Sequence, residues 1–305
     1  MNKLKKILYN AARQYLKKQF TNNLGKVVED DEKITCYVKK SKIKNNKYNC
    51  SIACFGIKEE EKDIAKAYNL NKPICYVIDG IELKKYNTYI FGYDNCEVIV
   101  NNCNFGFGLS ISVHGKCTLS NTNIRTFSHL SIGANELIIK DMESNQINVV
   151  GSEYRFLFGA DDKMEIVNSN IGNQEKNIKI SMLATNELNV INSNIVGKEI
   201  ECKSVTINTD EKSSLIATDN VNLQTNNCNP INISAPEIVF NGEKIENEKN
   251  SILLKKMNEP LTQKRFELVN ILKKLKSQCE NINSEKVLEY QEKLNVQPVS
   301  KVLKK

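Results

Sequence analysis

Residues 117–141 read CTLSNTNIRTFSHLSIGANELIIKD, and this segment contains two copies of one pattern, apolar–x–apolar–x–Asn or Asp. The first copy is Cys117, Leu119 and Asn121; the second, 20 residues later, is Leu137, Ile139 and Asp141. Successive side chains of a β-strand point to opposite faces, so this alternation predicts a strand that buries both apolar residues. A strand pattern that returns within so short a distance predicts a repeat architecture.

The pattern occurs eight times, and every copy has apolar residues at both alternating positions. The spacing between copies varies from 16 to 27 residues, which excludes a helical repeat of fixed period. Further apolar positions recur before and after most copies, so each turn of chain holds two or three short strands. This predicts one coil of a parallel β-solenoid. The copies are Val98, Val100, Asn102; Cys117, Leu119, Asn121; Leu137, Ile139, Asp141; Met164, Ile166, Asn168; Leu188, Val190, Asn192; Val205, Ile207, Thr209; Val221, Leu223, Thr225; and Ile238, Phe240, Gly242.

The polar residue that ends each copy predicts a ladder. Stacked coils lie about 4.8 Å apart, so equivalent residues of neighbouring coils come into contact. Asn tolerates the left-handed conformation of a tight corner, and its amide can bond to the same amide one coil further on. The chain contains 42 Asn. We therefore expect an internal ladder with a structural role, formed by Asn102, Asn121, Asp141, Asn168 and Asn192.

Over about residues 90–245 the coil pattern resembles the right-handed parallel β-helix proteins, the pectate-lyase-like superfamily, whose coils carry such ladders. Right-handedness is implied by this resemblance alone. The bactofilins, cytosolic β-solenoids that polymerise, are similar to a lesser degree, because the present coils are richer in Asn and the ends more elaborate. The expected fold is dominated by β-structure, with a parallel β-solenoid of about eight coils and α-helical N- and C-terminal ends.

Four regions are expected along the chain. They are a basic amphipathic helix at 1–25, a small α+β capping region at 26–85, the parallel β-helix at 86–247 and C-terminal helices at 248–305. An exposed strand edge invites polymerisation, so both ends are expected to be covered. Within these ends we predict a hairpin formed by 34–38 and 48–52, a helix at 59–68, an imperfect ninth coil at Ile81 and Leu83, and helices at 261–279 and 284–294.

Residues 1–20 combine an apolar stripe with six cations and no acidic residue. One interpretation is a helix that caps the solenoid and exposes a solvated lysine face, and this is the simpler one. The other is contact with an anionic membrane surface or a partner. The stripe is Leu4, Ile7, Leu8, Ala11, Ala12, Tyr15, Leu16 and Phe20, and the cations are Lys3, Lys5, Lys6, Arg13, Lys17 and Lys18.

Residues on one lateral face are the candidates for chemistry. Enzymes of the resembled superfamily commonly act on polysaccharides through carboxylates and basic side chains of such a face. His114, Asp161 and Asp162 are expected there, two coils apart, with Arg155 on the segment leading to Asp161. The alternative is that Asp161 and Asp162 form a turn between strands, and this is favoured because no catalytic motif of the superfamily matches.

Composition and charge limit the expected location, cofactors and partners of the protein. The net charge is +7, and no apolar run approaches the 18 residues of a membrane-spanning helix. The ten Cys include no Cys-x-x-Cys pair, and the N-terminus does not read as a secretion signal, so we expect free, mostly buried thiols in a cytoplasmic protein. No metal or cofactor is expected. Residues 251–305 are basic but contain one Arg and no known motif, so nucleic acid is not an expected partner.

The leading functional hypothesis is a non-enzymatic cytoplasmic scaffold or protein-binding, assembly protein, whose partner is another protein or further copies of the chain. Two alternatives stay open. One is a carbohydrate-active enzyme of the pectate-lyase-like type that uses Arg155, Asp161, Asp162 and His114. The other is a peripheral membrane protein that assembles at an anionic surface through residues 1–20.

Overall fold

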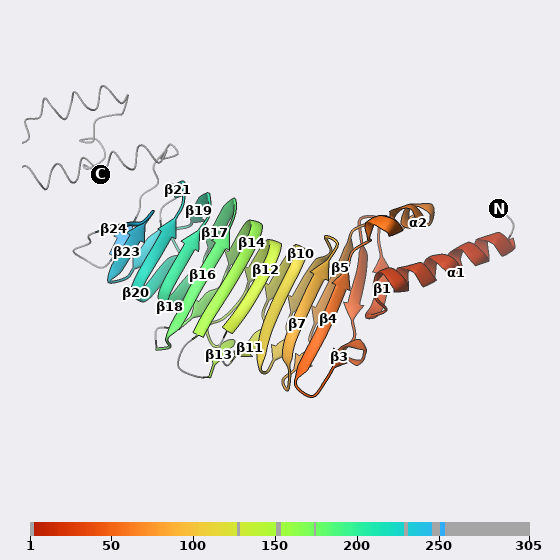
Figure 1. Ribbon diagram of the computed structural model, residues 1–305, viewed down its shortest axis with the longest axis horizontal. Helices are drawn as coiled ribbons and strands as arrows, with labels where there is room; N and C mark the ends of the chain where they lie inside the picture. The colour runs from red at the N-terminus through yellow and green to blue at the C-terminus, as the bar shows by residue number, and fades with distance from the viewer. Residues whose placement is uncertain are drawn as a thin grey trace, which may run out of the picture. The chain divides into compact units, whose positions relative to one another are not determined.

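The computed structural model describes residues 3–126, 129–150, 154–173, 175–228, 231–245 and 251–253. They belong to a compact unit, Met1–Lys256, which is separate from a second unit, Met257–Lys305. The helices predicted at 261–279 and 284–294 lie outside the described residues. Figure 1 shows the strands of the first unit lying one beside the next in chain order. The predicted parallel β-solenoid of about eight coils is confirmed.

The solenoid has three faces, which we call A, B and C. Along the chain, each coil passes through them in the order C, B, A. Face A contains β2 (Ile34–Val38), β5 (Ile74–Asp79), β8 (Glu97–Asn101), the later parts of β10 (Gly108–Ser120), β12 (His129–Lys140) and β14 (Tyr154–Val167), then β17 (Glu187–Ile191), β19 (Thr206–Thr209) and β21 (Asn227–Cys228). Face B contains β4 (Asn49–Phe55), β7 (Asn87–Tyr93), the earlier parts of β10, β12 and β14, β16 (Ile178–Ala184), the later parts of β18 (Asn194–Lys203) and β20 (Ser214–Gln224), and β23 (Glu237–Phe240). Face C contains β6 (Glu82–Leu83), β9 (Asn104–Phe105), β11 (Asn123–Thr126), β13 (Ile147–Val149), β15 (Asn170–Gly172), the earlier parts of β18 and β20, and β22 (Asn232–Ser234).

The apolar residues of the repeat stack directly over one another. On face A, Val100, Leu119, Ile139 and Ile166 are successive partners in parallel register. All four are buried. Neighbouring coils therefore share one apolar core, which no single coil could bury by itself. Face B stacks Ile52, Ile90, Ile111, Ile132, Phe158, Met182, Cys202, Leu223 and Phe240 in the same way.

The last three predicted copies do not continue the column of the first five. The predicted copies align Leu188 with Val205. Instead, Leu188 pairs with Ile207, which lies two residues further along the chain, and Val205 is exposed. The copies that begin at Val221 and Ile238 stack on face B, above Ile200. The prediction was wrong here because apolar alternation recurs on both faces, and alternation alone does not say which face a strand occupies.

Both ends of the parallel stack are closed by strands that run in the opposite direction. At the N-terminal end, β1 (Gly25–Glu29) pairs antiparallel with β2, and β3 (Lys44–Asn45) with β4. At the C-terminal end, β24 (Glu243–Ile245) pairs with β23, and β25 (Ser251–Leu253) with β22. The expectation that the ends are covered is met on these faces. The predicted hairpin between 34–38 and 48–52 is wrong, because β2 and β4 lie on different faces.

Three further elements complete the N-terminal end. The predicted helix at 59–68 is confirmed as η2 (Glu59–Glu61) followed by α2 (Lys62–Ala67). A second 3-10 turn, η1 (Lys40–Lys42), precedes β3. Ile81 and Leu83 do not form the predicted imperfect ninth coil: Leu83 lies in β6, the face C strand of the coil that continues into β7 and β8, and pairs with Phe105. The predicted N-terminal helix is α1 (Lys3–Phe20).

The predicted Asn ladder forms, but it lies on the outside of the corner. Asn102, Asn121, Asp141, Asn168 and Asn192 all have φ between 42° and 54° and all are exposed. Asn121 donates to Asn102 at 2.6 Å and Asn192 donates to Asn168 at 2.9 Å. Asp141 accepts from Asn168 at 3.3 Å but has no amide to donate, so Gln146 donates to Asn121 instead. The prediction that this ladder is internal was wrong.

A second ladder, of hydroxyl groups, lies inside the same corner. The residue after each corner Asn turns inward, and in two coils it is Ser169 and Ser193, both buried. Ser193 Oγ accepts the backbone N–H of Ser169 at 2.9 Å and donates to the carbonyl of Ile191 at 2.7 Å. Ser213 Oγ accepts the N–H of Ser193 in turn, at 3.0 Å. These hydroxyls satisfy backbone groups that the tight corner removes from the strand ladders.

Candidate functional site

The predicted lateral residues lie where face B turns into face A. His114 lies on β10 and Asp161 and Asp162 on β14, two coils apart as expected, with β12 between them. Both carboxylates are exposed. Asp162 accepts a hydrogen bond from Asn186 at 2.7 Å, and the His114 ring meets the Tyr93 ring edge-on at 5.7 Å. These contacts are those of a polar corner between strands.

Arg155 is on the same strand as Asp161 but is not brought close to it. It lies six residues earlier, which corresponds to roughly 20 Å along an extended strand. Its neighbours across the sheet are His129 and Lys179, not a carboxylate. Arg155 is therefore too far from Asp161 and Asp162 to act with them, as the enzymatic alternative requires.

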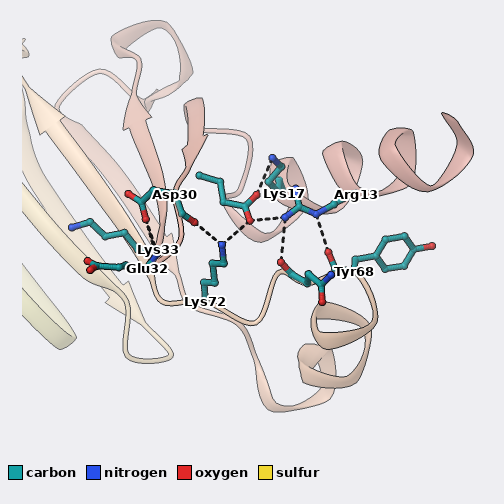
Figure 2. Close-up of polar contacts among 9 residues, drawn as sticks. Arg13, Lys17, Asp30, Glu32, Lys33, Tyr68 and Lys72 are labelled. Carbon is teal, nitrogen blue, oxygen red and sulfur yellow. Dashed lines mark hydrogen bonds and ion pairs between the residues drawn. The ribbon is translucent and has the colours of Figure 1, made fainter. Parts of the chain in front are cut away.

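Among the described residues, the carboxylate with the most ion pairs is Glu29, the last residue of β1, at the N-terminal end. Arg13 Nη2 and Lys72 Nζ contact its Oε1 at 2.5 and 3.1 Å, and Lys17 Nζ contacts its Oε2 at 3.2 Å. Figure 2 shows Arg13 and Lys17 of α1 and Lys72 of the loop before β5 converging there. Arg13 Nε also donates to the carbonyl of Tyr68 at 2.9 Å. This cluster fastens α1 to the solenoid.

Glu29 stays ionised in this cluster far below the usual range of a carboxyl group. Burial of the Glu29 carboxyl favours its neutral form, but hydrogen bonds from Arg13, Lys72 and Lys17 outweigh burial and lower its pKa to about 2. Because the folded pKa lies below the unfolded value, near 4.5, the ion pairs stabilise the docked helix above pH 4.5. This contribution is lost as the pH falls from 4.5 towards 2.

Glu29→Gln is expected to loosen α1 at neutral pH by about 1–2 kcal/mol, because Arg13 and Lys17 lose their anionic partner. Amide hydrogen exchange of residues 3–20 measures the opening free energy. The difference from the natural protein should shrink as the pH falls from 4.5 towards 2, because Glu29 then takes up a proton when the helix opens. Glu59→Gln is the control, since that side chain is 83% exposed in its ion pair with Lys62. A pH-independent difference would contradict the assigned pKa.

Helix α1 presents two different faces. Tyr9, Arg13, Lys17 and Phe20 lie one above the other and contact the rest of the unit: Tyr9 stacks on Tyr68 at 5.1 Å between ring centroids, and the Phe20 carbonyl accepts from Tyr76. The opposite side is apolar and exposed, with Leu4, Ile7, Leu8 and Tyr15 between 56% and 63% accessible.

The predicted basic contact residues differ in whether they form ion pairs. Arg13 and Lys17 are engaged by Glu29, whereas Lys5, Lys6 and Lys18 are exposed. The side chain of Lys3 lies outside the described residues. Phe20 was predicted to lie on the stripe with Leu4 because both are apolar, but Phe20 is buried against the solenoid.

An outward-facing group of aromatic rings lies on face B, near the N-terminal end. We call Phe55, Tyr89, Phe91 and Tyr93 the aromatic patch. Phe91 lies 6.4 Å from Tyr89 and 6.3 Å from Tyr93 between ring centroids, and Phe55 lies 5.2 Å from Tyr93, all with planes within 21° of parallel. This patch was not predicted from the sequence, although the alternation Tyr-x-Phe-x-Tyr at 89–93 is a signal for it.

The cysteines are built into the core. In the described part of the chain, eight cysteines are free and buried, which confirms the expectation for them, and Cys228 is half-buried. Burial raises the pKa of Cys36, Cys50 and Cys103 to about 11 in each case. Such thiols are poor nucleophiles at neutral pH, so they act as small apolar side chains. Cys279 lies outside the described residues.

Comparison of the chain with protein-family models, curated proteins and solved structures gives no match. Among the described helices, none is long and apolar enough to cross a membrane. Within the same residues, no group of three or more His, Cys, Asp or Glu is placed to hold a metal ion. The candidate sites that remain are two surfaces: the aromatic patch and the exposed face of α1.

Proposed function

We propose that this protein is a non-enzymatic scaffold that binds another protein through the aromatic patch. The observation that carries the proposal is the group of near-parallel rings of Phe55, Tyr89, Phe91 and Tyr93 on the outer surface of two neighbouring strands. Tyr89 is 36% accessible, and the other three are half-buried. Aromatic residues are enriched in the cores of protein interfaces and depleted elsewhere on protein surfaces.

The solenoid supports such a surface well. Both strands that carry the patch are paired along their length, β4 with β7 and β7 with β10, so the rings are held in place before a partner arrives. Preorganisation reduces the ordering cost of binding. The next coil presents Ser110 beside Tyr89 and Ser112 beside Phe91, so small hydroxyl residues border the rings. An apolar centre with a polar border is the usual anatomy of a protein interface.

The enzymatic alternative receives less support, because Arg155 and the acidic pair at Asp161 and Asp162 are separated along β14. The cytoplasmic location inferred from composition stays a prediction. Self-assembly through the closed ends is also less well supported than binding at the side, because antiparallel strands occupy the ends of the parallel stack.

The double substitution Tyr89→Ser with Phe91→Ser tests the proposal. The new serines on β7 would lie beside Ser110 and Ser112 of the next coil, which already occupy this surface, so folding should be unaffected. A partner captured with the natural protein is purified and its affinity remeasured for each variant; we expect a loss of at least tenfold, as for aromatic hot spots. Leu157→Ser, at an exposed site on the same face, is the matched control.

Equal affinity of the partner for the patch variant and the natural protein would contradict the proposal. An oligosaccharide that binds the natural protein and not the patch variant would contradict it as well, by assigning the rings to a carbohydrate. The melting temperature of each variant shows whether a loss of binding reflects a loss of folding.

A further inference from the structure

Helix α1 carries an exposed apolar surface that the rest of the described unit does not cover. We call Leu4, Ile7, Leu8, Ala11 and Tyr15 the α1 stripe; each is exposed. Residues three and four apart share one side of a helix, so these five form a continuous band. The band lies opposite Tyr9, Arg13, Lys17 and Phe20, which hold the helix against the solenoid. A surface helix normally turns its apolar face inward, and α1 does the reverse.

The charges around the stripe have one sign. Helix α1 contains no acidic residue. Two of its cations, Arg13 and Lys17, form ion pairs with Glu29 on the docked side. Lys5 and Lys18 are exposed and lie three residues from Leu8 and Tyr15, so the exposed side of the helix is positive as well as apolar. Lys6 is also exposed, but it lies on the docked side, in line with Arg13. An apolar band with neighbouring lysines has the composition of helices that lie in a membrane interface.

We propose that the α1 stripe binds an anionic phospholipid membrane, with its apolar residues among the acyl chains and Lys5 and Lys18 at the headgroups. The inference goes beyond the proposed scaffold and does not depend on the aromatic patch. Anionic headgroups complement the lysines, and a lipid surface accepts a long apolar band without a matching groove. Lysine side chains reach from an apolar surface to headgroup depth through their methylene stems.

A second copy of this chain fits the stripe less well. Two α1 stripes placed face to face would bring the lysines of both copies together, and α1 offers no carboxylate to pair with them. Like charges at an interface cost binding energy. Because the Glu29 cluster docks α1, the helix is already formed and its stripe faces away from the solenoid. Lipid binding therefore does not have to order the helix.

Flotation of the full-length, untagged chain with lipid vesicles tests the inference. We expect at least tenfold tighter binding to vesicles with about one third phosphatidylglycerol than to phosphatidylcholine alone, and weaker binding as salt rises. Ile7→Gln with Leu8→Gln should reduce binding at least tenfold. Lys5→Gln with Lys18→Gln should reduce it by about fivefold per lysine on the anionic vesicles only.

Matched controls separate the stripe from exposed residues in general. Leu157→Gln with Val205→Gln removes two apolar side chains of similar exposure elsewhere on the unit. Lys39→Gln with Lys40→Gln removes two exposed lysines at another place. Both controls should bind vesicles as the natural protein does. The aromatic-patch variant should also bind normally, so failure of the scaffold proposal and failure of this one are distinguishable.

Two results would overturn the inference. One is vesicle binding that is absent, or that is unchanged by Ile7→Gln with Leu8→Gln. The other is sedimentation showing a dimer that the same double substitution dissociates while vesicles do not compete with it, because the stripe would then be covered by a second copy. Helix content from circular dichroism confirms that each variant still forms α1.

Discussion

Phe158→Ala is expected to lower the free energy of unfolding by about 3–5 kcal/mol, the usual cost of removing a buried aromatic ring from a packed core. Phe158 lies in the middle of face B, between Ile132 on one coil and Met182 on the next, and is 1% accessible. Because a solenoid is stabilised by contacts between neighbouring coils, the cavity weakens two interfaces at once. Urea unfolding followed by circular dichroism measures the change.

Leu157→Ala is the matched control for this prediction. Leu157 is the adjacent residue on the same strand, but it points outward and is 42% accessible. Its truncation is expected to change the free energy of unfolding by less than about 0.5 kcal/mol. Comparable losses for the two variants would contradict the assigned orientation of β14, since a shift of one residue exchanges the two faces of a strand.

Much of this architecture could be predicted from residues such as Val100, Leu119 and Ile139. Their alternation is strict, and a polar residue follows at a fixed distance, so local pattern and global stacking agree. The later coils were harder. Between Asn192 and Phe240 the chain crosses from face C to face B without a break in β18 and β20, and the same alternation then serves two faces. The choice between faces is made by contacts between coils, which the sequence does not display.

The corner illustrates the same limit at a single residue. Asn168 signalled a left-handed corner, and its φ of 50° agrees. The Asn168 side chain points outward and Ser169 turns inward because of the direction in which the chain bends at this corner. The sequence pattern does not give that direction. The candidate sites were predicted less completely. The basic helix was evident from Lys3 to Lys18, but the partner of Arg13 and Lys17 is Glu29, and nothing in the local pattern connects it to α1.

Ser193→Ala is expected to lower the free energy of unfolding by about 1–3 kcal/mol, because it leaves the buried N–H of Ser169 without an acceptor. Ser193 is fully buried, and its Oγ accepts that N–H at 2.9 Å. The side chain is small, so the loss of apolar contact is slight and the unsatisfied donor dominates the cost. Urea unfolding gives the total, and hydrogen exchange at Ser169 reports the loss of its bond directly.

The chain itself supplies the control for this substitution. Thr122 occupies the equivalent corner of an earlier coil, where its hydroxyl donates to the Ser120 carbonyl at 2.7 Å. Ser193→Thr therefore keeps both hydrogen bonds and is expected to cost less than about 1 kcal/mol. Should Ser193→Thr be as destabilising as Ser193→Ala, the hydroxyl would not be the stabilising group. If the threonine variant retains stability, the inner hydroxyl ladder, and not the exposed Asn ladder alone, fixes the chain at each corner.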